Sequence, residues 1–576
     1  MTHQIKIHDR NYSSFDTKNI LTTNNEKLDI RPFEQKLFTD DTFDINSENN
    51  EIKIISSCVR SMQNIPGVLI VSGNKTYGKK PNGCKSLYKC IPYNKCIPPF
   101  LVSYEIKHIG FSKVFVNLYV TFSFVEWKDK HPIGILTNVI GPINVLINFY
   151  EYQLYCKNLN VSIKKFHKEV VEKTTLTPYE ILIENIKYTY PNIEDRTNMH
   201  IFTIDSETTK DYDDAVSIDI LNDDTYKLSI YISNVAILID ALNLWQSFTD
   251  RVSTIYLPDK KRSMIPIILS EEYCSLQENT NRIAFTMDVY VKNGDIINTE
   301  FRNCIINVSK NYHYEEKELL NDEKYRQIFE ITKKLSVRYK YFNYIQSSHD
   351  VVAYLMILMN HNCAQNMLKR HIGIFRSSII NNNNKIEIPL YVPQEVSTHI
   401  NMRYTYSGEY INISELNITD IECIIHKQLD LNAYIHITSP IRRLVDLLNM
   451  IKFQEIILGV NLSKEAYKFY EKWINKIDYI NTSMKSARKI QNECSLLDIC
   501  SNDETIIDKE HEGYIFNKSN RSDGTYKYDV FLLSLKMFTK ISLRENIDDF
   551  RVKKFKLFLF NEEDNVYKKI KLQMLD

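Results

Sequence analysis

Short apolar runs mark both ends of the chain as β structure. After residue 50 they are separated by Gly, Pro, Asn and Lys, which is typical of strands joined by turns, and lie at 67–71, 100–104 and 116–120. Similar runs return near the end, at 526–532, 538–543 and 555–559. Each of these two regions therefore predicts a small β-barrel.

The middle of the chain mixes strand and helix patterns. Apolar residues alternate with polar ones at 226–232, as in a half-buried strand, and 284–291 and 301–308 have the same character. Longer apolar patterns at 352–367 and 441–458 predict helices. The fold class that follows is α+β, with a mixed central domain between two β regions.

The patterns divide the chain into successive segments, as expected for 576 residues at about 100–200 residues per domain. In chain order we predict a polar, partly disordered lead-in at 1–50, a β-barrel region at 51–165, a linker at 166–193, a central domain at 194–505 and a second barrel at 506–576. No internal repeat with a fixed period occurs.

The global charge is balanced, with 72 Lys+Arg against 72 Asp+Glu, so any contact with nucleic acid must come from locally placed charge. The segment 73–81 interleaves basic residues with Tyr77, which suits single strands; a solvated basic turn is the alternative. No apolar run is long enough for a membrane span, and the start lacks the apolar core of a signal peptide. We expect a cytoplasmic protein with no membrane partner; a nuclear location stays open.

The 11 cysteines are scattered, as expected of free thiols. Cys84, Cys90 and Cys96 are evenly spaced, but their spacing matches no usual zinc motif and no histidine lies nearby. We interpret these three as structural residues.

Four aspartates between two apolar strands are the sharpest feature: Asp205, Asp211, Asp213 and Asp214. Four carboxylates within ten residues repel one another unless a cation neutralises them. Mg²⁺ prefers oxygen ligands and combines a few carboxylates with substrate phosphate oxygens, so the cluster predicts one or two Mg²⁺ ions and phosphate chemistry. A solvated acidic turn or a calcium loop is the alternative, although the spacing does not match an EF-hand. Polymerases and endonucleases could use the same cluster.

A second candidate segment follows at 436–448. Ser439 and Pro440 predict a helix start, through a side-chain cap and the fixed φ of proline. Arg442 and Arg443 would then lie in the first turn, where the helix dipole disfavours cations unless an anion is bound. Arg442 is our candidate for stabilising charge on the scissile phosphate. The alternative is that both arginines pair with Asp446.

Taken together, these segments resemble the family of ribonuclease II, ribonuclease R and the catalytic exoribonuclease subunit of the eukaryotic exosome. The stretches that carry the resemblance occur in family order and lie at 203–214, 256–258, 264–270, 274–285 and 436–443. The fragment from Gly67 to Val102 and the stretch from Lys130 to Gly134 resemble the eukaryotic branch more than the bacterial one. The space before residue 50 is too short for the N-terminal endonuclease domain of the exosome subunit.

The resemblance implies roles for the aspartates. Asp205, Asp211 and Asp214 would hold Mg²⁺, and Asp213 would be the aspartate on which catalysis most depends. The architecture implied is an RNB catalytic domain flanked by OB-fold barrels, cold-shock-like before it and S1-like after it.

The resemblance also implies substrate contacts. Arg442 would contact the phosphate beside Arg443, and Tyr256 would stack on the base at the RNA 3′ end. For Tyr256 the alternative is a packing role in a strand. Two departures from the family pattern, at 231–235 and at Leu444, affect secondary contacts rather than the aspartates.

The function implied is Mg²⁺-dependent, processive 3′→5′ hydrolysis of single-stranded RNA to nucleoside 5′-monophosphates by a monomer. A catalytically inactive RNA-binding or scaffold protein with the same fold is the first alternative. A metal-dependent endonuclease is the second.

Overall fold

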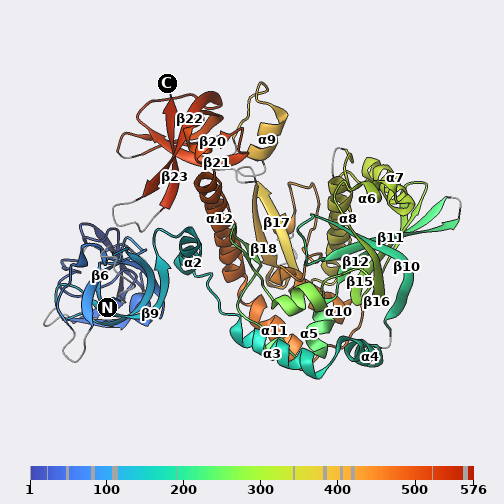
Figure 1. Cartoon of the computed structure of the whole chain (residues 1–576), viewed down its shortest axis with the longest axis horizontal. Helices are drawn as coiled ribbons and strands as arrows, with labels where there is room; N and C mark the ends of the chain where they lie inside the picture. The colour runs from blue at the N-terminus through green and yellow to red at the C-terminus, as the bar shows by residue number, and fades with distance from the viewer. Residues whose placement is uncertain are drawn as a thin grey trace. The chain divides into compact units, whose positions relative to one another are not determined.

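The structure of the protein is a computed structural model, and its chain forms two compact units. The residues it describes are 2–22, 24–26, 28–46, 51–79, 85–106, 115–190, 192–222, 224–341, 344–380, 386–401, 406–416, 422–521, 523–561 and 568–575. One unit consists of 1–160, 257–259 and 488–576, and the other of 161–256 and 260–487. Figure 1 labels their helices and strands.

A closed five-stranded barrel in the order β10-β11-β12-β15-β16 forms the centre of the second unit (Figure 1). Its strands are β10 Glu194–Asp205, β11 Asp214–Asn222, β12 Thr225–Ser233, β15 Asn281–Lys292 and β16 Asp295–His313. Strands β10 and β16 run parallel and close the barrel, with Asp205 opposite His313. The three strands predicted in this part of the sequence are confirmed. Leu228, Ile230 and Ile232 of β12 are fully buried.

Helices form much of the rest of the second unit. They are α3 Lys164–Leu176, α4 Tyr179–Thr189, α5 Val235–Ala241, α6 Lys317–Asn321, α7 Glu323–Arg338, α8 Ser348–Leu368, α9 Gln394–Ile400, α10 Leu444–Ile456, α11 Lys464–Ile474 and α12 Ile477–Asn502, the last of which continues into the first unit. Helices α6 and α7 pack against strands of the barrel. Short pairs β13 Ile255–Tyr256 with β14 Lys261–Arg262, and β17 Ile374–Ile380 with β18 Tyr406–Asn412, complete the unit. Helix α8 confirms the helix predicted at 352–367, and begins with a capping box between Ser347 and Asp350.

The predicted helix start at Ser439 is wrong. Residues 440–442 form a single turn closed by the Arg443 N–H, which donates to the Ser439 carbonyl at 3.0 Å, and helix α10 begins only at Leu444. Arg443 is extended, with φ −132° and ψ 124°, because it bridges to Ser253. The Leu444 N–H also donates to the Val252 carbonyl at 2.9 Å. Tertiary strand pairing therefore overrides the local helix signal.

The first unit contains a second closed barrel, in the order β5-β6-β7-β9-β8. Its strands are β5 Ile65–Leu69, β6 Ser86–Pro92, β7 Phe100–Tyr104, β8 Leu118–Glu126 and β9 Ile133–Pro142, and helix α2 Leu146–Cys156 follows it. Phe100 and Phe122 meet in its interior with ring centroids 4.9 Å apart. The β-barrel predicted from residue 51 onward is confirmed.

The end of the chain forms a five-stranded, barrel-like sheet in the order β21-β20-β19-β22-β23. After the short helix α13 Glu504–Asp508, its strands are β19 His511–Asn520, β20 Tyr526–Leu532, β21 Met537–Leu543, β22 Arg551–Asn561 and β23 Lys568–Leu575. All three apolar runs predicted as strands here lie in strands. The predicted α+β fold class, with β domains before and after the central one, is thus confirmed.

The predicted disordered lead-in at 1–50 needs correction. Its described residues contribute three strands to a sheet in the order β2-β1-β3-β4, followed by the one-turn helix α1 Cys58–Ser61. The strands are β1 Thr2–Ile7, β2 Phe15–Asn19, β3 Thr42–Ile45 and β4 Ile52–Ser56. Ile5, Ile7 and Phe43 are fully buried on one face, so a few well-spaced apolar residues order a segment that is polar overall.

Two further sequence predictions concern membranes and cysteines. Among the described helices, none has the length and apolar character to cross a membrane. Cys90 is buried and Cys96 half-buried, both as free thiols, whereas Cys84 lies outside the described residues.

Candidate active site

A cleft of about 520 Å³ at one end of the central barrel contains all four aspartates. Asp205 ends β10 and Asp214 begins β11, and the loop between these antiparallel strands carries Asp211 and Asp213. The residues lining the cleft are Asp205, Ser206, Thr208, Thr209, Lys210, Asp211, Asp213, Asp214, Tyr256, Lys261, Glu271 and Arg442. The structure thus brings together the aspartates, Tyr256 and Arg442, as the sequence predicted.

Asp213 is held from two sides by the turn that precedes α10. It is only 3% exposed, and one carboxylate oxygen accepts the Ile441 backbone N–H at 3.1 Å. Its other oxygen lies 3.0 Å from Nε of Arg442. Burial raises the pKa of Asp213 to about 7, although Arg442 and the Ile441 N–H act in the opposite direction. Arg442, which we expected in the first turn of a helix, thus lies in a turn before α10 and pairs with Asp213.

Asp205 and Asp214 have less compensation for their charge. Burial raises the pKa of both carboxyls, and for Asp205 the neighbouring Asp214 and Asp213 raise it further. Among the described residues, Oδ2 of Asp205 is buried and has no hydrogen-bond partner. An unsatisfied, buried carboxylate oxygen among like charges is a position that a cation would stabilise.

The donor set decides which cation fits. All candidate ligands are carboxylate oxygens, which suit Mg²⁺ rather than zinc. Within the described part of the chain, no three His, Cys, Asp or Glu side chains are already grouped around one point as metal ligands. Mg²⁺ usually takes only one or two protein carboxylates and fills its shell with water and phosphate oxygens. The residues therefore fit Mg²⁺, and the ligand roles of Asp205, Asp211 and Asp214 stay predictions.

Arg442 and Arg443 of the second segment have different partners. Arg442 pairs with Asp213, so the alternative that it pairs with Asp446 is wrong. Arg443 does pair with Asp446, at 2.8 Å, and it is not among the residues lining the cleft. The 43% exposed Tyr256 ring lines the cleft and its hydroxyl hydrogen-bonds Arg442, a placement that suits substrate contact better than core packing.

Sequence reasoning missed two residues that line the cleft, Lys261 and Glu271, and one that contacts Asp205, Tyr314. Nζ of Lys261 lies 2.9 Å from Asp211 and 2.7 Å from Glu271. Tyr314 follows β16, its N–H donates to the Asp205 carbonyl at 2.9 Å, and the pKa of its hydroxyl is raised by burial and by the nearby aspartates. The only sequence signal for Lys261 was its place five residues after Tyr256, where a tight hairpin returns it to the same cleft.

The residues that depart from the family pattern make their contacts outside the cleft. Asn234 caps α5 through its side chain, and its amide donates to Asn303 at 2.9 Å, which in turn donates to Gln454 at 2.7 Å. Ser233 donates to a backbone carbonyl at 2.6 Å, and Leu444 is fully buried. None of these five residues lines the aspartate cleft.

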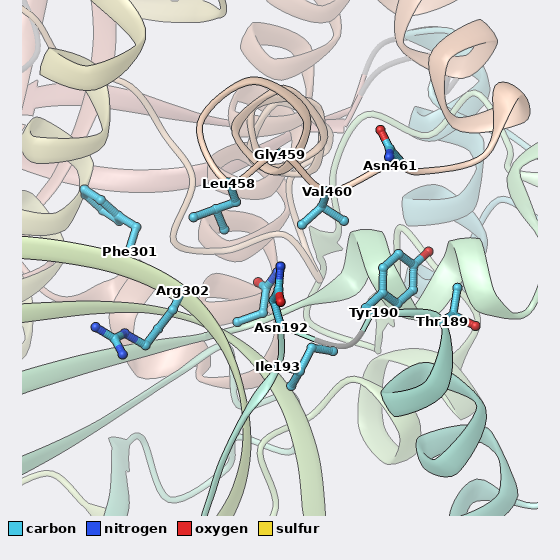
Figure 2. Close-up of a pocket in the computed structure, with 11 residues that line it drawn as sticks. Thr189, Tyr190, Asn192, Ile193, Phe301, Arg302, Leu458, Gly459, Val460 and Asn461 are labelled. Atoms are coloured by element: carbon cyan, nitrogen blue, oxygen red, sulfur yellow. The ribbon is translucent and has the colours of Figure 1, made fainter.

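A second pocket of about 360 Å³ lies elsewhere in this unit and shares no lining residue with the aspartate cleft. Figure 2 shows Leu458 and Val460 facing Asn192 and Ile193 across it. Its single cationic lining residue, Arg302, pairs with Glu194 at 2.7 Å. Because no Asp, Glu, His or Cys lines it, this pocket does not offer ligands for metal-assisted phosphate chemistry.

Comparison with known families matches residues 193–345 to the RNB domain. The central domain of this chain is therefore similar to the RNB domain of exoribonucleases. The matched range of the RNB domain contains the four aspartates, Tyr256 and Lys261, whereas Arg442 lies beyond its end.

Sequence relatives come from two branches of the RNB family. The chain is 33% identical over 160 residues to DIS3-like exonuclease 2 of Schizosaccharomyces pombe, covering 28% of this chain and 17% of the relative. It is 30% identical over 176 residues to ribonuclease R of Mycoplasmopsis pulmonis, covering 30% and 23%. These alignments span less than a quarter of either relative. Similarity to both a eukaryotic and a bacterial protein does not resolve the branch, so the predicted eukaryotic placement stays a prediction.

Solved structures share the whole fold at low sequence identity. Ribonuclease R of Mycoplasma genitalium in complex with ribose-methylated single-stranded RNA has a TM-score of 0.67 at 14% identity, covering 100% of both chains. The same protein in complex with double-stranded RNA gives 0.63 at 15% identity, covering 92% of this chain and 98% of that one. Yeast Ssd1, described as a pseudonuclease, gives 0.61 at 12% identity, covering 94% and 78%. A protein named as a ribonuclease and one described as a pseudonuclease therefore share this architecture.

Proposed function

We propose that the protein is a Mg²⁺-dependent exoribonuclease that degrades single-stranded RNA processively from its 3′ end and releases nucleoside 5′-monophosphates. The observation that carries the proposal is the convergence of four aspartates with Arg442 and Tyr256 in one cleft of an RNB domain. The aspartates offer ligands for a catalytic cation, Arg442 offers a charge for phosphate, and Tyr256 offers an aromatic face for a base of a single strand.

Each residue of the cleft has a physical role in this proposal. Mg²⁺, when bound, would activate a water molecule and polarise the scissile phosphate. Arg442 is partly exposed, so its guanidinium can donate to a phosphate oxygen while Nε stays on Asp213. Asp213, anchored by Arg442 and the Ile441 N–H, would orient the attacking water or accept its proton, which requires the ionised carboxylate.

Tyr256 would hold the terminal base. Its ring is partly exposed and its hydroxyl is fixed by Arg442, so base stacking and phosphate contact are coupled through one hydrogen bond. A stack of this kind accepts any base, which fits degradation without sequence preference.

The first barrel offers a further contact with single strands. Tyr77 is 37% exposed, Nζ of Lys75 lies 5.6 Å from its ring centroid, and the His131 ring lies 6.4 Å away. Aromatic rings beside cations form a typical stacking surface for single-stranded nucleic acid. Lys80 and Pro81 of the predicted basic loop lie outside the described residues.

The test is incubation of the protein with 5′-labelled single-stranded RNA and Mg²⁺. We expect a ladder of products shortened from the 3′ end, no cleavage of circular RNA, and loss of cleavage in Asp213→Asn. Asp219→Asn is the matched control, because Asp219 lies on β11 outside the cleft and pairs with Lys227 at 3.1 Å. A product pattern identical to that of the no-enzyme lane, or one that Asp213→Asn leaves unchanged, would contradict the proposal. Cleavage of circular RNA would indicate an endonuclease instead.

The second candidate is an RNA-binding or scaffold protein with an inactive RNB fold, and the shared architecture of the pseudonuclease Ssd1 supports it. Four mutually repelling carboxylates, three of them with raised pKa values, are costly to retain without a use for them. RNA binding without cleavage in the same assay would favour this candidate.

A further inference from the structure

Lys261 occupies one side of the aspartate cleft. Its ammonium lies 2.9 Å from Oδ1 of Asp211 and 2.7 Å from Oε1 of Glu271. The side chains of these three residues are only 24%, 10% and 19% exposed, respectively. The lysine is therefore a bridged cation inside the cleft rather than a solvated one.

Three separate segments bring this triad together. Lys261 belongs to the β13–β14 hairpin, where it pairs with Tyr256. Glu271 comes from the π-helical turn Ile268–Tyr273, and Asp211 from the loop between β10 and β11. Such convergence from the barrel, a hairpin and a helical turn fixes the ammonium relative to the aspartates.

The ammonium of Lys261 is bridged between two carboxylates. Its ion pairs with Asp211 and Glu271 neutralise part of the negative charge of both side chains.

Two-ion nucleases hold their ions about 3.5–4 Å apart, and each ion needs carboxylate oxygens of its own. In this cleft, one carboxylate oxygen of Asp211, Oδ1, and one of Glu271, Oε1, are bound to Lys261. A divalent ion there would have to displace a partly buried ammonium and break two ion pairs. Asp205, by contrast, has a buried oxygen, Oδ2, with no hydrogen-bond partner in the described chain.

We propose that Lys261 stands in for a second divalent ion, so that the cleft binds one divalent ion, on the side of Asp205 and Asp214, and a fixed ammonium on the side of Asp211 and Glu271. The inference rests on the proposed metal-dependent function and sharpens it. The ammonium would also be available to contact a substrate phosphate oxygen, in addition to Arg442, which pairs with Asp213.

The experiment counts bound ions directly. Mn²⁺ replaces Mg²⁺ and is titrated into the full-length protein, with free and bound ion separated by electron paramagnetic resonance. We expect one bound Mn²⁺ in the wild type and two in Lys261→Met, with the exchange coupling of a close ion pair. Lys261→Arg keeps the cation and should bind one. Lys260→Met, at the exposed neighbouring position, is the matched control and should also bind one.

A double variant keeps the test independent of folding defects in Lys261→Met. Lys261→Met with Glu271→Gln removes the cation and one carboxylate, and should return the count to one. Two ions in the wild type, or one ion in Lys261→Met as well, would overturn the role of Lys261 while leaving the metal-dependent function standing. No bound Mn²⁺ in any variant would overturn this inference together with the proposed metal site.

Discussion

Two charged clusters lie in the central barrel and differ in how their carboxylates are paired. Asp288 is fully buried and accepts two hydrogen bonds from Arg196, at 2.8 and 2.6 Å, and one from Ser229 at 2.6 Å. Burial alone would raise its pKa, but these partners lower it. In the cleft, the pKa values of Asp205, Asp213 and Asp214 are all raised.

The difference separates charge that supports the fold from charge that is available for chemistry. The Asp288 cluster neutralises itself with protein cations, so it needs nothing from outside. The four cleft aspartates outnumber the cations that pair with them, Arg442 and Lys261. In addition, one buried oxygen of Asp205 has no hydrogen-bond partner among the described residues. Perturbed carboxyls of this kind in a cleft indicate a functional site.

The largest effect is expected from Asp213→Asn. The amide keeps the size of the side chain but cannot accept a proton from water, so kcat should fall by about 10²–10⁴-fold. RNA affinity, measured by fluorescence anisotropy, should change little. Asp219→Asn should retain full activity. Equal loss of affinity and rate would assign Asp213 to binding instead.

Asp288→Asn, in contrast, is expected to lower the stability of the fold. This change leaves Arg196 with a buried charge that only the partly exposed Glu194 still balances, and should cost about 3–5 kcal/mol in the free energy of unfolding. Urea denaturation followed by circular dichroism measures it. A stability within 0.5 kcal/mol, roughly the effect of a surface substitution, would remove the contrast between the clusters.

A smaller effect is expected from Tyr256→Ala. Loss of one stacked base should cost about 1–3 kcal/mol of RNA binding, raising KM for short oligonucleotides by roughly 5–150-fold. Tyr256→Phe keeps the ring and loses the hydrogen bond to Arg442, so it separates stacking from hydroxyl positioning. If both variants bind as the wild type does, Tyr256 does not contact the substrate.

The smallest effect is a pH-dependent gain in stability from Asp205→Asn. Because the folded-state pKa of Asp205 is raised, the folded protein holds this proton more tightly than the unfolded chain does. Wild-type stability should therefore fall as pH rises from about 4, the ordinary aspartate value, through the raised pKa. Without divalent ions, Asp205→Asn should melt roughly 2–4 °C higher than the wild type at pH 8.5.

At pH 4 the two proteins should melt alike, because the carboxyl is then protonated in the folded wild type. Differential scanning calorimetry in the presence of a chelator checks both conditions. A variant that melts lower than the wild type at pH 8.5 would contradict the assignment of Asp205 as an underpaired carboxylate.

Most of the fold and the centre of the site could be predicted from the sequence because their signals are local. The apolar runs at 526–532 and 100–104 coincide with strands β20 and β7. The four aspartates lie within ten residues of one loop, so a strand–loop–strand pattern is enough to bring them together.

Features that depend on distant contacts could not be predicted. The helix predicted from Ser439 begins at Leu444 because the preceding backbone pairs with another segment. Arg443 bridges to Ser253, and the Leu444 N–H donates to the Val252 carbonyl. The N-terminal sheet is ordered by few apolar residues in a polar segment. Lys261 has no motif of its own, and only the hairpin places it on Asp211.

The most direct test of the account is to identify the first product released from a linear RNA labelled on its 3′-terminal nucleotide. In the presence of Mg²⁺, the wild type should release the label at once as a nucleoside 5′-monophosphate, and Asp213→Asn should leave it on the RNA. Release of the label in longer internal fragments, or its complete retention by the wild type, would contradict a cleft that hydrolyses RNA from the 3′ end.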